Sequence, residues 1–122
     1  MIHGYVIVFF LLSSIFAVTH QVAVQVSLYW YYWWFDSMMH FWGGILIGLG
    51  IHALATLPHL HIKASTKLIL FALAFATITW EIFEWYYGLF GVRNYIFDTS
   101  KDIVLGFSGG LLAHIILRRR IQ

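Results

Sequence analysis

Two stretches of the sequence, FDSMMHFWGGILIGLGIH at residues 35–52 and FDTSKDIVLGFSGGLLAH at residues 97–114, decide the fold. They carry one polar pattern twice, 62 residues apart, with one position every four residues: Asp36, His40, Gly44, Gly48 and His52, then Asp98, Asp102, Gly106, Gly110 and His114. Four residues make about one turn of an α-helix, so each copy predicts a helix with one distinctive side. That side begins acidic, continues with glycine and ends in histidine. The sequence therefore predicts two similar helices, each with these residues along one side.

The composition places these helices in a lipid bilayer. The chain has 122 residues, of which 61% are hydrophobic and 10% are charged, and its mean hydropathy is +0.83. A soluble domain of this size leaves too much surface in water to hide so many apolar side chains. The net charge of +2 comes from the terminal run of residues 118–120, so it does not indicate nucleic-acid binding. The sequence contains no cysteine, which excludes a thiolate metal site.

Four apolar stretches are long enough to cross a membrane, because a spanning helix needs about 20 apolar residues. The predicted fold is all-α: one integral membrane domain over residues 1–122, built as a four-helix transmembrane bundle. The expected spans are residues 4–26, 38–57, 67–89 and 101–117. Since the repeated pattern falls in the second and fourth spans, the bundle is expected to contain two weakly similar helix pairs in parallel orientation.

The distribution of positive charge predicts the orientation of the bundle. Lys63, Lys67 and the arginines at 118–120 fall at one end, whereas Arg93 and Lys101 at the other end are offset by nearby acids. Cytoplasmic loops carry the excess of lysine and arginine, so both termini are expected to be cytoplasmic. The aromatic residues 29–35 then lie at the outer interface as an anchor or a short interfacial helix.

With this topology, all five carboxylates of the chain come to the outer membrane surface. Their spacings place side chains on shared helix faces at i,i+3 or i,i+4, and a carboxylate inside a span normally faces the bundle interior and marks function. A divalent cation, Mg²⁺, Mn²⁺, Ca²⁺ or Zn²⁺, would relieve the repulsion between these groups. The expected ligands are Asp36, His40, Glu81, Glu84 and Asp102.

Structural interpretations of the same residues stay open. Asp36 and Asp98 have the residue type favoured at helix N-caps, and the two glutamates could pair with Arg93 or Lys101. The four repeated glycines have a packing explanation, because small residues four apart let membrane helices approach closely. The expected helix-packing residues are Gly44, Gly48, Gly106 and Gly110. Interface hydrogen bonding is the expected role of His52 and His114.

The motif Asp36-x-x-x-His40-Phe41, an acidic motif on the next span and Asp98-x-x-x-Asp102-x-x-x-Gly106-x-x-x-Gly110 resemble the VanZ-like membrane proteins. The tryptophan-flanked Glu81-x-x-Glu84 is similar to the YjdF-like group of small membrane proteins. The resemblance covers about residues 36–110. It implies an envelope protein of a bacterial or archaeal cytoplasmic membrane, linked to cell-wall or lipid-linked precursors. Asp102 and Glu84 depart from the asparagine and glutamine common in VanZ-like proteins, which makes this site more acidic.

Three functions follow from these observations. The first is a metal-dependent hydrolase or transferase on a lipid phosphate, in which Glu81 and Glu84 are catalytic and Arg93 and Asp98 bind the substrate. The second is a non-catalytic assembly factor, or a small subunit of a membrane complex or homo-oligomer. The third is ion or proton coupling, which is least favoured because the middle of the spans carries glycine and aliphatic residues rather than a polar path.

Overall fold

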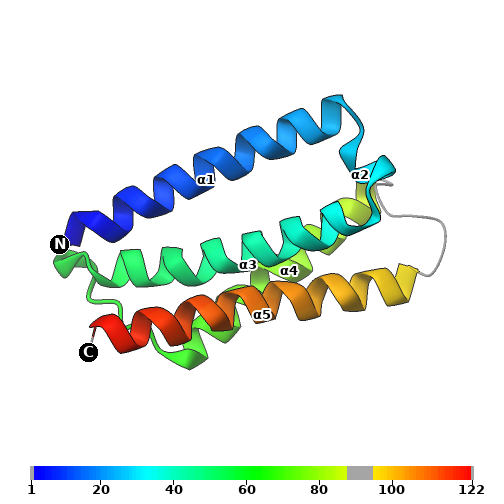
Figure 1. Cartoon of the computed structure of the whole chain (residues 1–122). Coiled ribbons are helices and arrows are strands. Elements are labelled where there is room, and N and C mark those ends of the chain that lie inside the picture. The colour runs from blue at the N-terminus through cyan, green and yellow to red at the C-terminus, as the bar shows by residue number, and fades with distance from the viewer. Residues whose placement is uncertain (1, 88–94, 122) are drawn as a thin grey trace.

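The computed structural model describes residues 2–87 and 95–121, and these residues are almost entirely helical. Four helices are long and apolar enough to cross a membrane, which confirms the predicted all-α fold with four spans. The first helix begins and the last helix ends at the same end of the bundle (Figure 1). The elements are α1 (Ile2–Gln25), α2 (Leu28–Tyr31), α3 (Trp33–Ala55), the 3₁₀ turn η1 (Pro58–Leu60), α4 (Thr66–Tyr87) and α5 (Tyr95–Ile121).

Two helices begin earlier than the expected spans at residues 38 and 101, because α3 starts at Trp33 and α5 at Tyr95. The expected spans began after Asp36 and Asp98, whereas each helix continues outward through one of these aspartates and three aromatic or aliphatic residues before it. Both aspartates lie within the first turns of their helices, where a negative charge favours the positive end of the helix dipole. Neither is an N-cap, since Tyr32 caps α3 and Asp98 lies inside α5.

The aromatic segment forms the short helix α2 and the start of α3 at the end of the bundle away from η1 (Figure 1). Trp30 and Trp33 are among the most exposed side chains of the chain, at 85% and 80%. Tryptophan and tyrosine are favoured at the membrane–water boundary, where one edge of the ring is apolar and the other is wet. The position agrees with the expected short interfacial helix.

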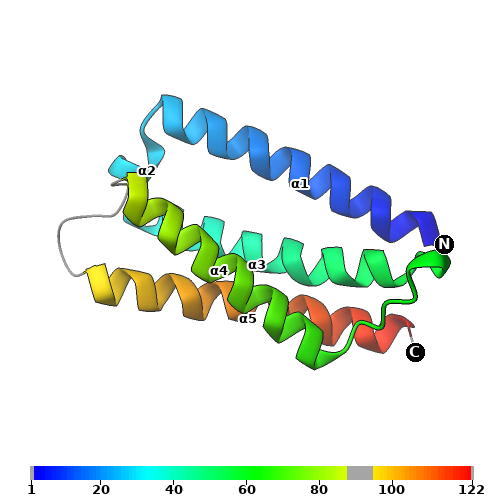
Figure 2. The ribbon, with the colours of Figure 1, turned by 180° about the vertical axis from the view of Figure 1, so that it is seen from behind.

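Helices α3 and α5 run side by side in the same direction through the middle of the bundle (Figures 1 and 2). Their close approach depends on glycine. A Cβ atom on Gly44 would overlap the carbonyl group of Gly106, and one on Gly48 would lie 2.7 Å from the carbonyl oxygen of Gly110. Gly109 faces α3 in return, so the two backbones touch in the way that small residues permit in membranes.

The space beside Gly106 and Gly110, on the side where a Cβ atom would stand, is filled by a third helix. Side chains of α4 fill it: Thr77 lies nearest Gly106, and Leu73 lies nearest Gly110. A larger residue at either glycine would therefore displace α4 as well as disturb the α3–α5 contact. The packing role predicted for the four repeated glycines thus extends to three helices.

Equivalent positions of the repeat face one another across the α3–α5 contact. His40 meets Asp102, Gly44 meets Gly106 and His52 meets His114, each pair 62 residues apart. The other two spanning helices are also placed equivalently: α1 packs on α3, and α4 packs on α5. The two helix pairs are thus parallel and in register. Steps of four residues exceed the 3.6 of a helical turn, so two straight parallel helices would lose this contact, and the pair must cross or coil to keep it.

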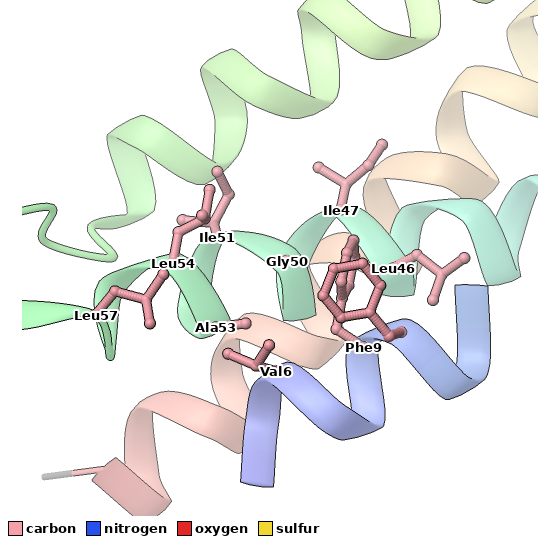
Figure 3. Close-up of a pocket in the computed structure, with 10 residues that line it drawn as sticks. Val6, Phe9, Leu46, Ile47, Gly50, Ile51, Ala53, Leu54 and Leu57 are labelled. Carbon is pink, nitrogen blue, oxygen red and sulfur yellow. The ribbon is translucent and has the colours of Figure 1, made fainter. Parts of the chain in front are cut away.

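Helix α1 is the least enclosed of the four spanning helices. Ala23 is the one buried residue among its described side chains, and it packs with Phe35 and Met39 of α3. Nearer η1, α1 and α3 border an apolar groove of about 450 Å³, in which Phe9 lies against Gly50 (Figure 3). The groove contains no charged side chain, and it is separate from the acidic residues at the other end of α3.

Candidate metal centre

The acidic side chains of three helices converge at the α2 end of the bundle. One ligand atom from each of His40, Glu81, Glu84 and Asp102 lies within 4.8 Å of the others. A second group, Asp36, Asp98 and Asp102, meets the same distance limit. Helix α3 supplies the first aspartate and the histidine, α4 the two glutamates, and α5 the other two aspartates. The five acids of the chain and one histidine therefore form a single cluster, the acidic cluster.

His40 occupies the centre of this cluster. Its Nε2 atom lies 3.4 Å from Oδ1 of Asp36 and 3.3 Å from Oδ2 of Asp102. Asp36 is one turn earlier on the same helix, whereas Asp102 reaches the ring from the facing position of α5. A single nitrogen thus stands between two carboxylates from different helices.

Asp102 is the most deeply buried acid of the cluster, with 1% of its surface exposed. Neither of its carboxylate oxygens accepts a hydrogen bond from the part of the chain that the structure describes. An ionised carboxylate removed from water without adequate partners costs several kcal/mol. Its depth follows from the glycine contact one turn further along α5, which draws the two backbones together. The nearest basic group that the structure describes is the His40 ring, with Nε2 3.3 Å from Oδ2 of Asp102.

Glu81 and Glu84 each use one oxygen for a hydrogen bond from a neutral donor. The hydroxyl of Thr99 donates to Oε2 of Glu81 over 3.2 Å, and Nε1 of Trp80 donates to Oε1 of Glu84 over 2.9 Å. These bonds orient the carboxylates without neutralising them. Glu81 is 9% exposed.

Lys101, the described lysine at this end of the bundle, does not pair with either glutamate. Lys101 lies 3.4 Å from Asp98 on its own helix, and both side chains are partly exposed. The alternative of an ion pair between Lys101 and a glutamate is therefore not what the structure contains. Arg93, the other expected partner and a predicted substrate contact, lies outside the described residues.

Tyr29 closes the cluster on the side of α2. Burial, together with the negative charges of Asp36 and Glu84, raises the pKa of its phenol to about 12. The hydroxyl of Tyr29 and Nδ1 of His20 are 2.8 Å apart and form a hydrogen bond. His20 also lies edge-on to Trp80, so α1 contributes to the surroundings of the site.

Residues 5–122 match the family described as "Predicted membrane protein (DUF2238)". The chain belongs to this family. No curated protein and no solved structure matches it. Membership of DUF2238 agrees with the four spanning helices and identifies an integral membrane protein.

A groove lies beside the acidic cluster of this DUF2238 protein. It lies between α4 and α5 and has a volume of about 210 Å³. Its walls are apolar except at two residues of the site, Glu81 and its hydrogen-bond donor Thr99.

The other end of the α3–α5 pair carries a second buried polar group. Nε2 of His52 and Nδ1 of His114 are 2.9 Å apart, and Nε2 of His114 is 2.9 Å from the hydroxyl of Thr66. Both histidines are at most 3% exposed. The expectation of interface hydrogen bonding is confirmed, and this bonded row fixes the register of α3, α4 and α5 at the end away from the acids.

Three residues around the cluster were missed by reasoning from sequence. The i,i+4 spacing of Trp80 and Glu84 was a usable signal, because residues four apart share a helix face. Thr99 also had a signal, since a hydroxyl residue follows the aspartate in both copies of the repeat. Tyr29 had none, because its position depends on how the chain folds back between α1 and α3.

Proposed function

We propose that this DUF2238 protein binds a divalent metal ion between His40, Glu81, Glu84 and Asp102 and acts on phosphate groups of membrane lipids or lipid-linked envelope precursors. The observation that carries the proposal is the buried carboxylate of Asp102, whose two oxygens accept no hydrogen bond from the described chain. Three carboxylates and one imidazole within 4.8 Å of one another form a donor set for a divalent ion. Oxygen donors favour Mg²⁺, Mn²⁺ or Ca²⁺, and an imidazole is compatible with Mn²⁺ or Zn²⁺.

The chemistry of such an ion suits phosphoryl groups. A bound divalent metal polarises a phosphoryl oxygen and makes a coordinated water a stronger nucleophile at neutral pH. Glu81 and Glu84 each keep one carboxylate oxygen that no described donor occupies, for metal coordination or for accepting a proton from the water. Asp98 and Arg93 are the residues that we assign to the substrate.

The surroundings of the cluster support a lipid as the substrate. The apolar groove between α4 and α5 has Glu81 and Thr99 in its lining, so it offers a place for an acyl or prenyl chain beside the carboxylates. Exposed aromatic side chains surround the same end of the bundle. Lys63, Lys67 and the exposed Arg118 lie at the opposite end, so the positive-inside rule places the site on the extracytoplasmic side. Kinship with the VanZ-like and YjdF-like proteins, and residence in a bacterial or archaeal cytoplasmic membrane, belong to the same proposal.

Metal content of the purified full chain tests the proposal. We expect bound metal in protein prepared in mild detergent without chelator. His40→Asn and Glu84→Gln should each lower the affinity for Mn²⁺ by at least about 10-fold, the lower limit seen even when only residues behind the ligands are changed. His59→Asn is the matched control, because His59 is an exposed residue of η1. Wild-type protein that binds no Mn²⁺, Mg²⁺, Ca²⁺ or Zn²⁺ would overturn the proposal.

Phosphate release separates catalysis from the non-catalytic alternative. Vesicles of phosphatidic acid or of a long-chain prenyl phosphate, mixed with the Mn²⁺-loaded protein, should release inorganic phosphate, and Glu81→Gln should abolish the release. If metal binds without release, and the substitution lowers only cellular abundance or partner recovery, the protein is an assembly factor or subunit.

A further inference from the structure

We propose that the acidic cluster holds two divalent ions, with the carboxylate of Asp102 as the bridge between them; this inference rests on the proposed function. The two groups of ligand atoms described above share one member. The group of His40, Glu81 and Glu84 and the group of Asp36 and Asp98 each include Asp102. A residue common to two adjacent ligand sets occupies the place of a bridging ligand.

Neither oxygen of Asp102 is held by a hydrogen bond from the described residues, and Nε2 of His40 lies 3.3 Å from Oδ2. Both oxygens are buried. Each glutamate of the cluster, by contrast, has one oxygen already engaged in a hydrogen bond. A carboxylate that bound one ion through one oxygen would leave the other oxygen buried and without a hydrogen bond from the described residues. Bridging gives each oxygen its own cation. Two-metal sites place their ions about 3.5–4 Å apart, a separation that a bridging carboxylate spans.

The charge of the cluster is also large enough for two ions. Five carboxylates are present, and among the described lysines and arginines only Lys101 pairs with one of them. The excess is four negative charges when His40 is neutral. Two divalent ions balance this charge, whereas one ion balances only half of it. Like charges held this close inside a membrane protein are stable only when cations or protons offset them.

The repeat predicts that the two positions differ in affinity. The first ion has His40, Asp102 and two glutamates of α4, which lack equivalents on α1, where Thr19 and Val22 stand 62 residues earlier. The second ion has three aspartates, of which Asp36 and Asp98 have side chains 28% and 42% exposed. Water can complete the coordination of the second ion, but it reaches the first ion less easily. Binding is therefore expected in two steps, with the buried position filled first.

Titration of the purified full chain with Mn²⁺, followed by electron paramagnetic resonance and by elemental analysis, tests this inference. We expect two Mn²⁺ ions per chain, with an exchange-coupled signal that grows as the second ion binds. Asp98→Asn and Asp36→Asn should reduce the stoichiometry to one and give the signal of an isolated ion. Lys101→Met is the control, because it removes the charge beside Asp98 but no ligand, and it should keep both ions.

The outcomes distinguish this inference from the proposed function. One ion per chain in the wild type, unchanged in Asp98→Asn, overturns the second ion and leaves the mononuclear site intact. Two ions without exchange coupling overturn the bridge by Asp102. A chain that binds no metal overturns both proposals.

Discussion

The acidic cluster arises at the positions where the repeat is broken. His40 and Asp102 are the one unlike pair among the five repeated positions of α3 and α5, and they face each other at 3.3 Å. A second difference lies in the hydroxyl residues, Ser37 and Thr99. Thr99 donates to Glu81, whereas the buried hydroxyl of Ser37 has no hydrogen-bond partner among the described residues. The hydroxyl that bonds to a glutamate therefore occurs only in the copy of the repeat that packs on α4.

Thr99 provides a prediction for a residue that positions a ligand. Thr99→Val keeps the shape of the side chain but removes the hydrogen bond to Glu81. Loss of a bond behind a metal ligand lowers affinity by about 10–100-fold, so we expect weaker Mn²⁺ binding with an unchanged unfolding temperature. Isothermal titration calorimetry and thermal unfolding in the same detergent measure the two quantities.

Two further variants complete this test. Thr99→Ser restores the hydroxyl and should restore the affinity. Thr79→Val is the matched control, because the Thr79 hydroxyl is exposed and bonds only to the carbonyl of Phe75 on its own helix. Equal affinity in Thr99→Val and in the wild type would show that the hydrogen bond does not position the glutamate.

The pairing of α3 with α5 is the contact on which the other elements depend. Its glycines bring the backbones together in the middle, and polar residues close it at both ends: His40 with Asp102 near α2, and His52 with His114 near η1. Helices in lipid gain little from apolar contact alone, so close packing and interhelical hydrogen bonds hold them. The order of these contacts along the helices excludes a register shift, because a shift would separate every polar pair.

Adjacent glycines of α3 give a prediction about this contact. In Gly44→Ala the new methyl group would overlap the backbone of Gly106, whereas in Gly43→Ala it would meet only a ring atom of Phe16 at 3.8 Å. Forcing an extra methyl into a close contact costs about 1–3 kcal/mol. We expect Gly44→Ala to lower the free energy of unfolding by this amount in an SDS titration and to weaken metal binding as the helices separate. Similar stability of the two variants would contradict the assigned contact.

The sequence was sufficient for some features of these elements and not for others. The four spans and the α3–α5 contact were predictable, because hydropathy and four-residue spacing of small residues are local patterns. The starts of α3 and α5 were not, because Asp36 and Asp98 interrupt the apolar stretches, although each helix includes three more aromatic or aliphatic residues before its aspartate. The bond from Thr99 to Glu81 depends on the rotation of α4 against α5, which no pattern within one helix specifies.

Across the whole molecule, the acidic side chains lie at one end of the bundle, and most of the described lysines and arginines lie at the opposite end. The acidic cluster and the aromatic α2 lie at one end, and η1 with the neighbouring Lys63 and Lys67 lies at the other (Figure 2). The hydrogen-bonded His52 and His114 lie at the basic end. Between them and the acidic cluster, the described residues of α3 and α5 are glycine and apolar residues apart from Ser108. This distribution suits a protein that works at one membrane surface.

The separation gives a prediction that single cysteines can test, because the natural chain has none. Ser100 and His59 are exposed at opposite ends of the bundle. In intact cells, a membrane-impermeant maleimide should label Ser100→Cys and should not label His59→Cys until the membrane is opened. Labelling of His59→Cys alone in intact cells would reverse the orientation and place the acidic cluster in the cytoplasm.

The in-register pairing of equivalent positions in α3 and α5 also bears on the origin of the chain. A hairpin of two spans returns to the side of the membrane from which it started, so joining two such hairpins end to end requires no change of insertion direction. The linker only has to cover the short distance along one surface. The present arrangement is the one that duplication and fusion of a self-associating hairpin would leave, with the glutamates retained or acquired in one half alone.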